Sequence, residues 1–342
     1  MSPLASEAIE RLACRLEKDA DRLVIDADTH VTDPESLFGE RRRMHESSPD
    51  YYHGRTISAE DLILEMDGAG VDMAVIWQNP AATVYTGEKD FNTRSLLAAN
   101  RYIRDAAARY PHRFIPGGWV DPKACGLERA LAMVETLVCE YGFPIVKFNP
   151  AQNEYRIDSP KVLAVVDRIV ALGAVPAFHF GADTPYTPAE GLRCLAERHP
   201  AHPLLAVHMG GGGASYPAAE ELYLAARKLG LEHPNIHYVL SAKRDAHMES
   251  DLITYQLAGE PYCRHLFCAS DAPYGRIAWN FGGFRAMFGT LMDGARHTDP
   301  RVRAHAGLFT PAAVQNYLGG NFARFAAESC RRLLGARQPC PA

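Results

Sequence analysis

The stretch VIDADTHVTDP, residues 24–34, starts like a buried strand and then places Asp28 and His30 two positions apart. Alternate side chains of a strand point to the same face, so we expect this carboxylate and this imidazole to face one point in space. Oxygen and imidazole ligands together suit zinc, manganese or iron(II) and do not suit copper(I). The spacing therefore predicts part of a metal site.

Three further polar residues stand at or just after the ends of other apolar runs, namely His179, His208 and Asp271. Each would be costly to bury without a partner, and the ends of parallel strands meet at one rim of a barrel. Position on the strands predicts a set of ligands for a divalent metal ion at this rim, made of Asp28, His30, His179 and Asp271. Zinc or manganese is favoured for such a set, and iron is possible.

His208 lies in the sequence VHMGGGGAS, where the glycines allow a tight turn. The run lacks the Gly-Lys-Ser/Thr ending of a phosphate-binding loop. We therefore predict that His208 is a general acid or base beside the metal, because an imidazole exchanges protons near neutral pH. Asp271 is the second predicted catalytic residue. The alternative for His208 is a structural histidine that only forms a hydrogen bond across the barrel mouth.

A further group of residues is predicted to line the same rim and contact a substrate: Trp77, Asn79, Lys147, Asn149 and Arg244. We favour Lys147 as a charge partner for the carboxylates; the alternative is a carbamylated lysine that bridges two metal ions. The long polar segment 31–59 is predicted to be a lid, since connections of this length are usually functional. One of its arginines, within residues 41–43 or at Arg55, would hold a substrate anion by a bidentate contact.

Apolar runs that alternate with helix-like segments must position these side chains. The predicted strands cover residues 23–30, 72–78, 113–120, 143–149, 174–181, 204–210, 236–242 and 266–271. The predicted helices between them cover residues 92–110, 126–141, 159–172, 188–198 and 214–230. Eight such units in 342 residues favour an α/β fold, a distorted (β/α)8 TIM barrel, over an open doubly wound sheet. We predict a helical prefix over residues 1–21 and a single barrel over residues 22–342, which includes the lid and extra helices after residue 309.

The composition narrows the classes of partner. The formal net charge is −5, so no general basic field attracts nucleic acid. The eight cysteines form no CxxC pair, no apolar run is long enough for a membrane span, and the N-terminal segment does not resemble a signal peptide. We therefore expect a cytoplasmic protein that binds neither nucleic acid nor a membrane.

The motifs IDADTH, FHFGAD, VHMGGG and ASDAPYG, in this order and at these separations, resemble the amidohydrolase superfamily. More narrowly, they resemble its branch of aminocarboxymuconate-semialdehyde decarboxylase-like enzymes, with γ-resorcylate and 5-carboxyvanillate decarboxylases. The resemblance implies one divalent metal ion in a (β/α)8 barrel, a homodimer, and a small-molecule carboxylate substrate that chelates the metal. Asp28 departs from the usual His-x-His opening and is nearer to the Glu-x-His form of some decarboxylases, and KFNP at residues 147–150 departs from the frequent Lys-x-His-Pro.

Together, residues and resemblance predict a metal-dependent, non-oxidative decarboxylase of a small aromatic or unsaturated carboxylic acid. Aromatic residues of the lid and rim, among them Tyr51 and Tyr52, favour an aromatic substrate. Hydrolysis of an amide or lactone by a metal-bound water is the alternative at the same site. An iron-dependent oxygenase on the same scaffold is the third hypothesis.

Overall fold

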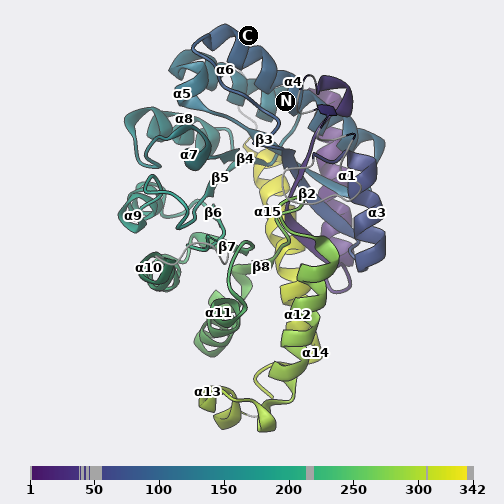
Figure 1. The fold of residues 1–342 in the computed structure, drawn as a ribbon, viewed down its shortest axis with the longest axis vertical. Helices are drawn as coiled ribbons and strands as arrows, with labels where there is room; N and C mark the ends of the chain where they lie inside the picture. The colour runs from purple at the N-terminus through teal and green to yellow at the C-terminus, as the bar shows by residue number, and fades with distance from the viewer. Residues whose placement is uncertain are drawn as a thin grey trace.

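The computed structural model describes residues 2–37, 39, 42–43, 46, 56–212, 219–305 and 307–336. Eight parallel strands, each hydrogen-bonded to the next in chain order, surround a common centre (Figure 1). The strands are β1 (Ile25–Val31), β2 (Met73–Gln78), β3 (Phe114–Trp119), β4 (Ile145–Phe148), β5 (Val175–His179), β6 (Leu204–Val207), β7 (Ile236–Leu240) and β8 (Leu266–Cys268). All eight lie where the apolar runs predicted them, and the fold is the predicted (β/α)8 barrel.

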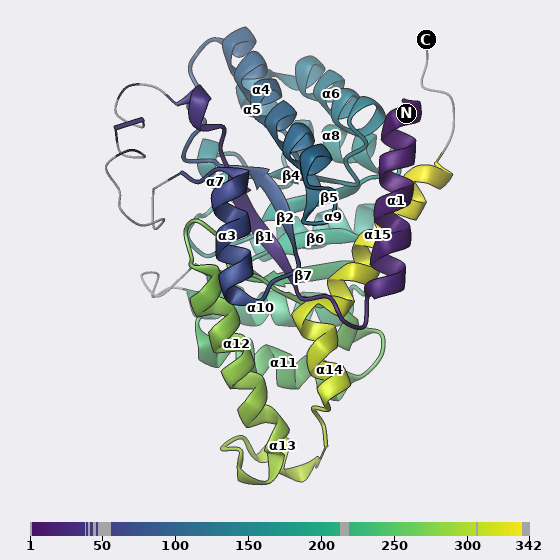
Figure 2. The same ribbon diagram turned by 90° about the vertical axis from the view of Figure 1, so that its right-hand side faces the viewer.

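Helices surround the strands and cover the outside of the barrel (Figures 1 and 2). Those between the strands are α3 (Ala59–Ala69), α4 (Lys89–Arg109), α5 (Pro122–Cys125), α6 (Leu127–Glu135), α7 (Pro150–Asn153), α8 (Pro160–Ala171), α9 (Ala189–Arg198), α10 (Ala219–Glu232) and α11 (Asp245–Ala258). The helices at the two ends of the chain are α1 (Pro3–Asp19), α12 (Ile277–Met292), α13 (Pro300–Ala304), α14 (Pro311–Gln315) and α15 (Asn321–Gly335). Short 3-10 or π-helical turns complete the set. Among the residues that the structure describes, no helix is long and apolar enough to span a membrane.

The barrel closes between β1 and the segment that follows β8. The backbone N–H of Asp271 donates to the Asp28 carbonyl at 3.0 Å, and the N–H of His30 donates to the Ala272 carbonyl at 2.6 Å. The register of β1 against β2 shifts between Asp26 and Thr29, which marks a β-bulge. Closure and bulge together place the end of β1 and the turn after β8 side by side at the mouth of the barrel.

Helix α15 and the π-helical turn before it cover the opposite end of the barrel. The π-helical turn Asn316–Gly320 packs against the start of β1 so closely that a Cβ on Gly319 would lie 2.0 Å from the Leu23 carbonyl oxygen. Phe325 of α15 packs against Phe267 of β8, and α1 lies against α15 (Figure 2). This end is therefore closed by packed side chains, and an active site is expected at the mouth at the other end.

Helix α4 differs in one detail from the sequence interpretation, which started this helix at residue 92. The helix begins at Lys89, and Asn92 is buried inside its first turns. The Asn92 amide donates to the Thr86 and Ala124 carbonyls, so it ties the preceding loop and α5 to the helix.

Candidate active site

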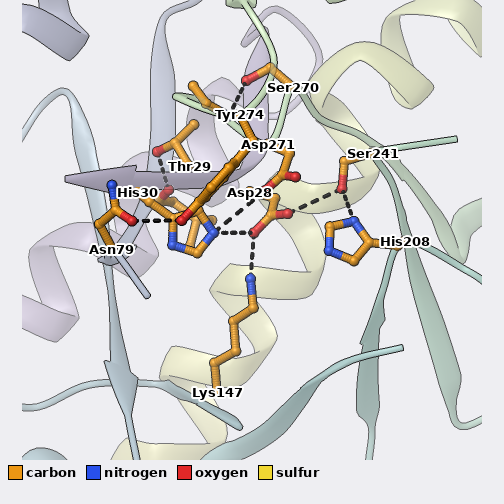
Figure 3. A network of polar contacts seen from close by, with 12 residues as sticks. Asp28, Thr29, His30, Asn79, Lys147, His208, Ser241, Ser270, Asp271 and Tyr274 are labelled. Atoms are coloured by element: carbon orange, nitrogen blue, oxygen red, sulfur yellow. Dashed lines mark hydrogen bonds and ion pairs between the residues drawn. The ribbon is translucent and has the colours of Figure 1, made fainter. Parts of the chain in front are cut away.

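His30 and two carboxylates converge at the mouth of the barrel (Figure 3). His30 Nε2 lies 3.7 Å from Asp28 Oδ1 and 3.5 Å from Asp271 Oδ1. One oxygen or nitrogen atom of each of the three side chains lies within 4.8 Å of the others, and Asp28 and His30 are buried. The structure thus brings together three of the four residues predicted as metal ligands.

The hydrogen bond at the other His30 nitrogen sets which atom faces the carboxylates. His30 Nδ1 lies 2.8 Å from the Gln78 carbonyl oxygen, which can only accept, so Nδ1 carries a proton. In the neutral ring, Nε2 is then an unprotonated nitrogen that points at two acidic oxygens. A lone pair aimed at carboxylates is unfavourable unless a cation or proton lies between them.

The spacing of these atoms fits a divalent ion. Two ligand atoms that each lie about 2.1 Å from one ion are about 3.4 Å apart in tetrahedral geometry. The separations of 3.5 and 3.7 Å from His30 Nε2 are close to that value and too long for hydrogen bonds. The two carboxylates and the imidazole also form a donor set that suits zinc, manganese or iron(II). The residues present therefore fit the metal ion that the sequence predicts.

Lys147 of β4 supplies the positive charge next to Asp28. Its Nζ donates to Asp28 Oδ1 at 2.7 Å, and both side chains are almost completely buried. Burial alone would raise the pKa of Asp28, but the charges of Lys147, His30 and His208 outweigh it and hold this pKa well below its usual range. Lys147 therefore forms an ion pair with a carboxylate, and its contact with a substrate stays a prediction.

Asp26, the first acidic residue of the motif, lies apart from this cluster. Its Oδ2 accepts a hydrogen bond from the Ser270 hydroxyl at 2.5 Å, and its Oδ1 accepts from the Ser270 N–H at 2.9 Å. Burial raises the pKa of Asp26 to about 7, against the lowering effect of these hydrogen bonds. Asp26 therefore stabilises the backbone just before Asp271, where the barrel closes.

His208 follows β6 in a constrained turn, with a backbone φ of 79°, and Met209 after it has a φ of 46°. Its Nδ1 lies 2.9 Å from Ser241 Oγ, and that hydroxyl donates to Asp28 Oδ2 at 3.1 Å (Figure 3). Burial lowers the pKa of His208 to about 4, with Asp271 opposing that shift. The ring is thus neutral at pH 7 and is linked through one hydroxyl to the Asp28 carboxylate.

His179, the fourth predicted ligand, lies beside His208 with the two ring centroids 4.7 Å apart. Its Nε2 is hydrogen-bonded to Asp183 Oδ1 at 2.8 Å. Burial would raise the pKa of Asp183, but the hydrogen bond and charge of His179 lower it. The role of His179 as a metal ligand stays a prediction, since its Nε2 is hydrogen-bonded to Asp183 and the three converging ligands are Asp28, His30 and Asp271.

A cavity of about 820 Å³ opens over these residues. Its polar lining contains His30, Lys147, Asn149, Gln152, His179, Asp183, His208, Lys243, Ser270, Asp271, Tyr274 and Asn280. Its size lies within the range typical of small-molecule sites. Both predicted catalytic residues, His208 and Asp271, border this space.

Three of the predicted substrate-binding residues lie away from this lining. Trp77 is fully buried, with Lys147 Nζ 5.2 Å from its ring, because Gly117 on β3 leaves room for the indole inside the barrel. Asn79 is buried and accepts a hydrogen bond from the Tyr274 hydroxyl at 2.7 Å, so it positions a cavity residue. Arg244 is exposed at the start of α11, because the chain turns outward after β7. Of the lid residues that we singled out, Arg41, Tyr51, Tyr52 and Arg55 lie outside the described residues.

The sequence interpretation missed several polar residues of the mouth. Asp183 stands within the quoted motif FHFGAD, and Ser241 directly follows the last residue of β7. Both occupy the same kind of position as the residues that were found, the end of a predicted strand or the turn after it. Tyr274 stands in ASDAPYG, three residues after Asp271.

Comparison with known proteins places the chain in a family. A family model described as amidohydrolase matches residues 25–325, and the chain belongs to this family. A search of curated proteins found no match.

Solved structures with the same fold include three decarboxylases at low sequence identity. The 2,6-dihydroxybenzoate decarboxylase from Rhizobium is 16% identical with a TM-score of 0.57, over 84% of this chain and 97% of that one. The 5-carboxyvanillate decarboxylase from Sphingomonas paucimobilis is 17% identical with a TM-score of 0.56, over 88% and 98%. The dihydroxybenzoic acid decarboxylase from Polaromonas sp. JS666, with bound manganese and the inhibitor 2-nitroresorcinol, is 16% identical with a TM-score of 0.59, over 90% and 97%.

Proposed function

We propose that this protein is a metal-dependent, non-oxidative decarboxylase of a small aromatic or unsaturated carboxylic acid. The observation that carries the proposal is the convergence of Asp28, His30 and Asp271 at the floor of a cavity large enough for such a molecule. Membership of the amidohydrolase family and the fold shared with three aromatic acid decarboxylases support the same reaction.

The metal ion would be held by Asp28, His30 and Asp271, with His179 joining them once Asp183 releases its Nε2. When bound, such an ion acts as a Lewis acid and holds the substrate through its carboxylate and a neighbouring oxygen. Manganese or zinc suits these ligands, and manganese is bound in the Polaromonas structure. Lys147 keeps Asp28 ionised, so that this carboxylate would be able to hold the ion.

The remaining chemistry falls to the side chains of the mouth. In decarboxylation the carbon that loses carbon dioxide keeps the electron pair of the broken C–C bond and takes up one proton. Asp271 and His208 border the cavity and are the candidate proton carriers. Asn149, which directly follows β4, provides an amide along the wall that would orient the substrate.

Turnover in deuterated water provides the test. Protein loaded with manganese or zinc is incubated with 2,6-dihydroxybenzoate, 5-carboxyvanillate and related hydroxybenzoates, and carbon dioxide and deuterium in the product are measured. We expect one deuterium at the carbon that carried the carboxylate, and loss of turnover in Asp271→Asn but not in the exposed control Asp293→Asn. Absence of carbon dioxide release with turnover of lactones or amides would replace the proposal by hydrolysis, and consumption of oxygen with iron would replace it by oxygenation.

We also propose that the chain forms a homodimer, as the resemblance to the decarboxylase branch implies. Light scattering coupled to size-exclusion chromatography would test this, with about twice the mass of one chain expected. A mass equal to that of one chain at micromolar concentration would contradict it.

A further inference from the structure

The Ser241 hydroxyl forms a bridge between two residues of the mouth that play different parts. On one side it lies 2.9 Å from His208 Nδ1, and on the other it donates to Asp28 Oδ2 at 3.1 Å (Figure 3). Ser241, Asp28 and His208 are all buried. Bulk water therefore does not compete for these hydrogen bonds, and their direction can be worked out from the protons available.

The proton count fixes the direction of both hydrogen bonds. The Asp28 carboxylate faces the Lys147 ammonium at 2.7 Å and, as an ion, can only accept. A serine hydroxyl has one proton, and here that proton is donated to Asp28. The hydroxyl oxygen must then accept at its other contact, so His208 Nδ1 is the donor and carries a proton.

We propose that Ser241 is a positioning residue that holds a proton on Nδ1 of His208, so that whenever the ring is neutral Nε2 is its unprotonated nitrogen. A neutral imidazole has one N–H, so a proton held at Nδ1 makes Nε2 an acceptor. His208 borders the cavity, and Nε2 lies on the side of the ring away from Ser241. In its neutral form, His208 can therefore act as a base at Nε2.

Hydrogen bonds on both sides fix the backbone around His208. Its N–H donates to the Val239 carbonyl at 3.0 Å, and Lys243 Nζ donates to the Met209 carbonyl at 3.0 Å. Lys243 is itself fixed by a buried ion pair with Asp251 at 2.5 Å. Because β7 and the residues after it hold the turn at both points, the backbone that carries the His208 ring is fixed. The Ser241 hydroxyl then fixes the orientation of the ring itself through Nδ1.

The consequence for catalysis rests on the proposed function, whereas the position of the proton does not. A base at Nε2 suits removal of a proton from a hydroxyl group of the bound substrate or from water. Without the Ser241 hydroxyl, the neutral His208 ring would exchange between the form with the proton on Nδ1 and the form with the proton on Nε2. Loss of such supporting hydrogen bonds typically costs 10–100-fold in activity. We therefore expect kcat of Ser241→Ala to fall by about 10–100-fold, with KM nearly unchanged.

Nitrogen NMR of histidine-labelled protein tests the proposal without turnover. Labelled zinc-loaded and metal-free protein are compared with His208→Gln, which identifies the His208 signals by their loss. We expect Nδ1 of His208 to resonate as a protonated nitrogen and Nε2 as an unprotonated one. In Ser241→Ala we expect averaged signals from both N–H forms, and in Ser241→Thr, which keeps the hydroxyl, the wild-type pattern.

Ser270→Ala is the matched control, since this variant loses a second buried hydroxyl of the mouth, one that donates to Asp26. Its His208 signals should stay those of the wild type. A proton on Nε2 in the wild type, or an unchanged His208 pattern in folded Ser241→Ala, would overturn the proposal. If Ser241→Ala does not fold, the wild-type spectrum and Ser241→Thr still decide it. Confirmed signals in a protein that decarboxylates nothing would instead refute only the proposed function.

Discussion

Replacement of Lys147 by methionine removes the buried cation beside Asp28 and keeps a side chain of similar length. The ammonium lies 2.7 Å from Asp28 Oδ1, and neither side chain is more than 2% exposed. At an effective dielectric constant of about 20, two unit charges at this distance attract by about 6 kcal/mol. Breaking a buried pair by removing one partner typically costs about 3–5 kcal/mol. We expect the free energy of unfolding of the metal-free variant to fall by that amount.

The loss of stability should depend on pH. In the wild type the pKa of Asp28 is held below its usual range, against the effect of burial. In Lys147→Met, fewer positive charges oppose the effect of burial, which raises the pKa of the Asp28 carboxyl. We therefore expect this pKa to rise. The native variant then binds more protons than its unfolded state, and its stability falls as the pH rises above about 4. The difference in stability between wild type and variant should therefore be larger at pH 7 than at pH 5.

Urea unfolding of chelator-treated protein, followed by circular dichroism at both pH values, provides the assay. Lys161→Met is the matched control, because Lys161 is an exposed lysine of α8, and its stability should stay within about 0.5 kcal/mol of the wild type. A Lys147→Met variant that loses less than about 1 kcal/mol at pH 7, or equally at pH 5 and 7, would refute the reasoning. Asp28 would then not depend on Lys147 for its charge.

Three further outcomes follow from the geometry. Asp271→Asn should lower kcat by about 10²–10⁴-fold, the range for loss of a general acid or base, in steady-state assays with a hydroxybenzoate that the turnover screen identifies. A variant with wild-type kcat would show that Asp271 takes no part in the chemistry. Gly117→Ala should cost at least about 1–3 kcal/mol in thermal unfolding, since the new Cβ would lie 1.9 Å from the Trp77 ring, whereas Gly87→Ala, with open space around it, should not. Asp251→Asn leaves Lys243 and Arg227 without their carboxylate and should lower the free energy of unfolding by about 3–5 kcal/mol. A variant as stable as the wild type would show that these ion pairs do not stabilise the fold.

The architecture and the centre of the site could be predicted because they depend on patterns that are local in the sequence. Eight apolar runs of strand length alternate with helix-like segments, and closure of such units brings their ends together. Asp28, His30 and Asp271 could therefore be assigned to one rim before the fold was known. Their polar character at the ends of buried strands carried the assignment.

The details that the sequence did not reveal depend on backbone turns and on packing between distant strands. The partners of His208 and His179 follow from turns with positive φ and from loops, which single-sequence patterns do not specify. Trp77 was assigned to the rim because its strand ends there, but the space that Gly117 leaves on the neighbouring strand buries the indole. Arg244 lies beyond the end of β7 at Leu240, in the turn before α11. The alternation of side chains along a strand therefore no longer predicts where the Arg244 side chain points.

Metal content per chain tests the central claim most directly. Protein purified without chelator, and then supplied with manganese or zinc and desalted, is measured by elemental analysis beside the double variant His30→Gln, Asp271→Asn. A double variant of exposed residues, His112→Gln, Asp293→Asn, serves as the control. We predict about one equivalent of metal in the wild type and in the control, and none in the double variant of the site. A wild type that takes up no metal, or a site variant that keeps its ion, would contradict the assignment of the barrel mouth as a metal centre.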